Sequence, residues 1–141
     1  MATFNKFNAF AENVYEGVHD LGADTLKVML TLTAPTATDA VKADLTEISA
    51  GNGYTAGGTT TAQSSSAQTS GTYKLVLADV TFTASGGAIA DFRYAVLYND
   101  TPTSPADALI GYWDYGSTVS LASGETFTWD ADPTNGVLQH A

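Results

Sequence analysis

The run "GNGYTAGG", from Gly51 to Gly58, is the part of the sequence with the clearest potential for ligand chemistry. Closely spaced glycines let backbone N–H groups approach a phosphate. A dinucleotide-binding fingerprint would need glycine at the position of Ala56, and a P-loop would need lysine at the position of Thr59. Both templates fail, so we expect neither a phosphate site nor a bound cofactor.

The run "DADPTNG", from Asp130 to Gly136, could place several oxygen ligands around a calcium ion. An EF-hand loop would need glycine at its sixth position, which is Asn135, and glutamate at its twelfth, which is Ala141. The side chains of Asp130, Asp132 and Asn135 are therefore expected to hydrogen-bond the backbone of their own turn rather than to bind a metal ion. We expect no metal centre.

Catalytic groups are sparse in this chain. His19 and His140 stand far apart in the sequence, there is no cysteine, and no serine lies in a recognisable nucleophile motif. These observations favour a protein that is not an enzyme. An enzyme that cleaves cell-wall polymer would need two carboxylates facing one cleft, and it is the least favoured alternative.

Aromatic residues near the C-terminus could form a flat platform for the apolar faces of sugars. The candidates for glycan stacking are Tyr112, Trp113 and Trp129. Alternation along the strands also fits these rings to a sandwich core, which we regard as the better interpretation. A carbohydrate-binding module is therefore the alternative function.

The elements that hold these residues are predicted to be β-strands in a single domain over residues 1–141. Apolar residues alternate in short runs separated by Gly, Asn, Asp and Pro turns, with no intervening helices. This pattern predicts an all-β fold, an antiparallel β-sandwich or jelly-roll-like barrel of about 7–8 strands. The expected strands are 25–34, 72–84, 91–100, 108–116, 118–122, 125–132 and 136–141.

Residues 1–22 are predicted to form an amphipathic N-terminal helix that begins at Thr3 and ends at Gly22. Its apolar stripe includes Phe4, Phe7, Phe10 and Val14, at helical spacing. So much apolar surface must dock on something, so these four residues are candidates for self-association or for binding a partner.

Residues 51–72 form a long Gly/Ser/Thr-rich segment inside a stretch without charge between Glu47 and Lys74. Such a segment is either a flexible linker or a strand covered by a partner chain, because it lacks the charged residues that protect free strand edges. Its candidate contact residues are Asn52, Tyr54, Thr59 and Thr61.

The charge balance restricts the partners. The chain has 15 acidic residues against five basic ones, a formal net charge of −10. Nucleic acid and anionic membrane surfaces are therefore unfavourable partners. The first residues also lack the pattern of a signal peptide, so we expect the protein to remain in the cytoplasm where it is made.

Three phrases, "AGNGYTAGG", "FRYAVLYND" and "IGYWDYG", carry a resemblance to small proteins that tailed bacteriophages encode among their virion structural genes. The resemblance extends over nearly the whole chain, including "FNKFNAFAENVYEGVHDLGADTLKV", "SGTYKLVLADVTFTASGG" and "GETFTWD". It implies a component of the virion, assembled in the cytoplasm of the host bacterium.

The role that this resemblance implies is a capsid decoration (cement) protein, or another head or tail accessory. Its expected partner is the major capsid protein or another virion protein, and a homotrimer is the expected oligomer. In the alternative, the chain is a carbohydrate-binding module of a tail fibre or spike.

Overall fold

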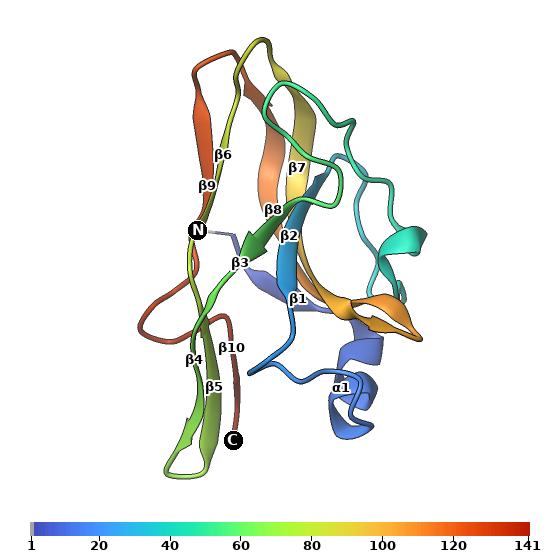
Figure 1. Cartoon of the computed structure of the whole chain (residues 1–141), viewed down its shortest axis with the longest axis vertical. Coiled ribbons are helices and arrows are strands. Elements are labelled where there is room, and N and C mark those ends of the chain that lie inside the picture. The colour runs from blue at the N-terminus through green and yellow to red at the C-terminus, as the bar shows by residue number, and fades with distance from the viewer. Residues whose placement is uncertain (1) are drawn as a thin grey trace.

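Two layers of antiparallel strands make up the structure, a computed structural model that describes residues 2–141 (Figure 1). Met1, the first residue of the predicted domain and helix, lies outside the described residues. The larger layer is a five-stranded sheet in the order β1-β8-β7-β2-β3. Its strands are Phe4–Lys6 (β1), Ala106–Leu121 (β8), Ile89–Thr103 (β7), Leu26–Thr31 (β2) and Thr59–Thr61 (β3).

The second layer consists of two smaller sheets. One has the order β10-β5-β4, from Leu138–His140 (β10), Thr72–Leu77 (β5) and Gln63–Thr69 (β4). The other pairs Val80–Thr83 (β6) with Thr126–Trp129 (β9). The predicted all-β antiparallel sandwich is thus confirmed.

Two of the expected strand divisions differ in the structure. The strand expected over 72–84 is interrupted at Ala78 and Asp79, where it divides into β5 and β6. The strands expected over 108–116 and 118–122 are instead one long strand, β8, because Gly116 adopts a positive φ of 83° without ending the strand. Three further strands, β1, β3 and β4, were not expected, so residues 2–141 contain ten strands rather than about 7–8.

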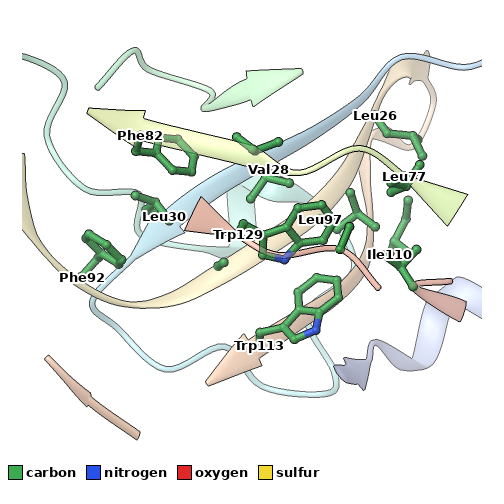
Figure 2. Close-up of a cluster of buried hydrophobic side chains, with 14 of the residues drawn as sticks. Leu26, Val28, Leu30, Leu77, Phe82, Phe92, Leu97, Ile110, Trp113 and Trp129 are labelled. Carbon is green, nitrogen blue, oxygen red and sulfur yellow. The ribbon is translucent and has the colours of Figure 1, made fainter. Parts of the chain in front are cut away.

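The main core lies between the two layers (Figure 2). Alternating residues Leu26, Val28 and Leu30 of β2 point into it and are fully buried. From the second layer come Leu77, Phe82 and Trp129, among others. Because the domain has no disulfide, this apolar burial between layers is its principal source of stability.

The outer face of the larger sheet is covered as well. Phe7, Met29, Val96, Tyr98 and Leu109 form a second buried cluster there, with Leu45 and Tyr112 packed against it. The apolar/polar alternation of residues 25–34 is typical of a strand buried on one face, but β2 is buried on both. The connection between β2 and β3, which includes the short 3-10 helix Lys42–Asp44 (η1), lies over this face (Figure 1).

The N-terminal helix is much shorter than predicted. Helix α1 spans only Asn8–Tyr15, and the residues before it form strand β1, which pairs with β8. Phe7 has the extended conformation of an N-cap residue, with φ −74° and ψ 146°. The expected helix start at Thr3 was therefore wrong. The three-residue spacing of Phe4, Phe7 and Phe10 fits one continuous helix, but it also fits a short strand followed by a helix.

The segment 51–72 is neither a linker nor dependent on a partner for its order. It contains β3, which pairs with β2, and the whole of β4, which pairs with β5. Ala62 alone separates the two strands, so the chain passes here from one layer to the other. The flexible-linker alternative was wrong, because Ser and Thr form strands where their own sheet supplies a neighbour.

Candidate functional site

An apolar groove of about 300 Å³ lies between helix α1 and strands β5 and β10. We call it the α1–β10 groove. Three of the predicted contact residues, Phe4, Phe10 and Val14, line it together. Its remaining lining residues are Lys6, Ala11, Tyr15, Leu21, Tyr73, Leu138, Gln139 and His140.

Each of the three predicted residues reaches the groove from a different environment. Phe4 is half-buried on β1, with its ring 5.2 Å from the ring of Trp113. Phe10 is buried on α1, and Val14 is half-buried one turn later. Phe7 does not take part, because it points to the other face of the sheet and is fully buried.

Tyr15 and His140 close one end of the groove. Their rings lie edge to face, 5.9 Å apart, and the Tyr15 hydroxyl is 3.1 Å from Nε2 of His140. Tyr15 is nevertheless 72% exposed and is the most exposed large apolar side chain of residues 2–141. A partner that enters the groove would therefore meet an aromatic ring that is already positioned.

The glycine-rich run is organised by Glu47. Its Oε1 atom accepts hydrogen bonds from the Tyr54 hydroxyl at 2.7 Å and from the Gly57 N–H at 2.6 Å. Tyr54 is buried, and burial together with the neighbouring Glu47 raises the pKa of its hydroxyl. Tyr54 is thus a structural residue. Because its side chain is buried within the chain, it does not present a surface for the predicted partner contact.

The other candidates of this segment divide by exposure. Thr61 is buried, and its hydroxyl donates to the carbonyl of Ala78 at 2.7 Å. Asn52 is exposed, but its Nδ2 donates to the carbonyl of Ala88 at 2.8 Å. Thr59 is exposed on β3, so of these candidates it alone presents a side chain without a structural bond.

The three aromatic candidates do not form a common platform. Trp129 is buried, and Trp113 meets it edge to face at 5.0 Å between the layers (Figure 2). Tyr112 lies on the opposite face of β8, where its ring is 5.2 Å from that of Phe7. Trp113 and Trp129 are therefore core residues, as the preferred interpretation of the sequence had it.

A second, open hollow of about 470 Å³ lies beside Trp113 and is lined by polar and apolar surface alike. Its lining includes Tyr115, Asp114 and Asp130. Asp114 forms a bidentate ion pair with Arg93, at 2.8 and 3.0 Å, and this bond lowers the pKa of its carboxyl. A carboxyl held ionised in this way is a poor general acid.

Among residues 2–141 no three His, Asp or Glu side chains gather in a way that could hold a metal ion. No helix there has the length and apolar character needed to cross a bilayer.

Several groove residues were not identified from the sequence. Tyr73 and Leu138 come from β5 and β10, which pair with each other far from α1 in the sequence. Tyr15 lies on the helix but was not placed on its apolar stripe. Only the tertiary arrangement brings these three side chains together, and no local pattern indicates it.

Comparisons of the chain with family models, with curated proteins and with solved structures find no match.

Proposed function

We propose that this chain is a non-enzymatic structural protein of a tailed-phage virion, most specifically a capsid decoration protein that binds and stabilises the shell. The resemblance in "AGNGYTAGG", "FRYAVLYND" and "IGYWDYG" supports the class. In this proposal the partner is the major capsid protein or another virion protein. The protein assembles into the virion in the bacterial cytoplasm, as a homo-oligomer for which we expect three copies.

The observation that carries the binding role is the α1–β10 groove. It offers Phe4, Val14 and the exposed ring of Tyr15 on one surface. Aromatic residues at the centre of a contact commonly supply most of its binding free energy. A protein that only needs to adhere to another protein requires such a surface and no catalytic group.

Undecorated phage shells provide the test. Adding the purified protein should raise the melting temperature of the shells, and the variant Tyr15→Ala should lose most of this effect. The matched control is Glu16→Ala, since Glu16 is exposed next to Tyr15 but does not line the groove. A protein that leaves the shells unchanged, or a Tyr15→Ala variant that binds as well as Glu16→Ala, would contradict the proposal.

A carbohydrate-binding module is the second candidate, and the hollow beside Trp113 favours it. Tyr115 could stack on a sugar ring there, and Asp130 could accept hydrogen bonds from sugar hydroxyls. The variant Tyr115→Ala should then abolish binding to host surface glycans while leaving shell binding intact. Glycan binding that persists in this variant would eliminate the hollow as the binding site.

A further inference from the structure

Strand β4 is an edge strand of the sheet β10-β5-β4, so within residues 2–141 it has a neighbour on one side only. Figure 1 shows the β4–β5 hairpin projecting at the end of the molecule opposite the paired strands β6 and β9. Thr69 pairs with Thr72 across Ser70 and Gly71, whose φ angles of 51° and 85° fit a type I′ turn.

This turn determines which backbone groups face outward. The residues that flank a two-residue turn exchange both hydrogen bonds, and every second pair of an antiparallel ladder repeats this arrangement. Thr69 and Ala67 therefore bond to β5, whereas the N–H and C=O groups of Ser66 and Gln68 point away from it. Across residues 2–141 no backbone partner satisfies these outward groups.

The edge is also unprotected chemically. Proteins commonly block free edges with lysine, proline or a bulge. The sequence of β4, "QSSSAQT", has no charge and no proline, and its bulge lies at the start of the strand, between Gln63 and Ser65. The ladder from Ser65 to Thr69 is regular, and only Ser66 is partly buried within it.

Charge indicates which partner can approach this edge. The chain carries a net charge of −10, so two copies repel each other over most of their surfaces. The stretch between Glu47 and Lys74, which includes β4, has no charged residue. A second copy can therefore come close to the edge of β4 with little electrostatic cost.

We propose that β4 pairs with β4 of a second copy, antiparallel, around a two-fold axis at Ala67. In this register Ser66 of each copy faces Gln68 of the other, and each such pair exchanges both hydrogen bonds. Ala67 lies opposite its own equivalent, where its small exposed side chain allows close approach. The pairing also avoids the bulge near Ser64.

This contact does not depend on the virion role. A contact with two-fold symmetry is complete with two copies, so a trimer would have to use other surfaces. The pairing is weak in solution, because a short strand with small polar side chains makes a small interface. A test must therefore trap the contact itself.

A single introduced cysteine can trap it, since the natural chain contains none. Non-hydrogen-bonded antiparallel pairs bring equivalent Cα atoms within disulfide range. Under mild oxidation Ala67→Cys should form covalent dimers at least about tenfold faster than Ser65→Cys, because pairing gives its two thiols a high effective concentration. Ser65 is the matched control, being exposed on the same face of β4 but offset from its equivalent in the proposed register.

Equal rates of cross-linking for the two variants would overturn the proposal, since they would indicate random collision. A faster rate for Ser65→Cys would overturn the register. A mixture of Ser65→Cys with Thr69→Cys should form the heterodimer in preference to either homodimer, because these positions face each other across the axis.

Hydrogen exchange gives a second measurement that needs no cysteine. The amides of Ser66 and Gln68 should exchange more slowly as the concentration of the natural protein rises. Ala67→Lys should abolish this dependence, because two ammonium groups would lie opposite each other. Protection that appears only when shells are added would mean that a strand of another protein occupies the edge, and self-pairing would then be wrong.

Discussion

The Tyr54 hydroxyl donates to Oε1 of Glu47 at 2.7 Å and accepts from the backbone N–H of Leu30 at 3.1 Å. Leu30 lies on β2 beyond the end of β3, where no strand of residues 2–141 bonds its outward groups. Its carbonyl accepts instead from the N–H of Ile48. The loop before β3 thus completes the hydrogen bonding of β2 and joins the glycine-rich run to the core.

Tyr54→Phe should lower the free energy of unfolding by about 1–3 kcal/mol, because the buried Leu30 N–H and the Glu47 carboxylate both lose a partner. Urea unfolding followed by tryptophan fluorescence would measure the loss. Tyr73→Phe is the control, since its hydroxyl bonds only Ser66, at 2.9 Å in a half-buried position. An equal or larger loss in Tyr73→Phe would contradict the role given to Tyr54.

Gly58→Ala should destabilise the fold by more than about 3 kcal/mol, because the change combines two penalties. Gly58 has a φ of +76°, and a Cβ atom there would lie 1.9 Å from the carbonyl oxygen of Val28. Gly71 has a similar φ of +85° but open space around it, so Gly71→Ala should cost only about 1–2 kcal/mol. Comparing the two variants by thermal denaturation isolates the steric collision, and similar melting temperatures would show that no collision occurs.

Stability should decrease in mild acid because of His19. Burial lowers the pKa of its imidazole from 6.5 to about 4, although Asp24 acts in the opposite direction. Since the folded pKa lies below the unfolded value, the unfolded chain binds the proton first as the pH falls. The free energy of unfolding is therefore retained above pH 6.5 and decreases between 6.5 and about 4, by up to about 3 kcal/mol.

Urea unfolding of the natural protein and of His19→Gln, at about pH 7 and about pH 5, would check this dependence. The natural protein should lose stability between the two conditions, and the variant should lose much less. Identical losses would assign the effect to other groups. Asp44, Asp114 and Asp132 have carboxyl pKa values lowered from 3.8 in the folded protein. Their contribution to the free energy of unfolding is therefore lost mainly below about pH 4, outside the range in which His19 acts.

Trp113→Ala should cost about 3–5 kcal/mol of stability, because the indole packs between Phe4 and Trp129 and is only 9% exposed. Circular dichroism on heating would record the lower melting temperature. A variant that melts normally but fails to bind glycan would reverse this expectation and give Trp113 the binding role.

Strand periodicity predicted the layers better than their edges. The alternation of Leu26, Val28 and Leu30 identified β2, and similar runs identified β7, β8 and β9. Burial of Met29 on the other face was not predicted, because the sequence does not indicate that the loop before β3 folds over that face. Alternation of apolar and polar residues along a strand indicates one buried face, but it does not indicate whether the other face is also covered.

The candidate site was predicted only in part. Phe4, Phe10 and Val14 do share a surface, but they do so from β1 and α1 rather than from one helix. Tyr54 and Thr61 were placed in a partner contact, whereas their side chains bond within the chain. The partners of these bonds, Glu47 and Ala78, are fixed by tertiary packing and have no local signal.

The passage from β3 to β4 at Ala62 couples the two layers of the sandwich. Thr61 bonds across to Ala78, and the Ala78 N–H donates back to Ala62, so one short crossing holds both sheets. Detaching β3 would expose the edge of β2, and detaching β4 would expose the edge of β5. The sandwich should consequently open as one unit, with the amides at those two edges reporting a single opening free energy.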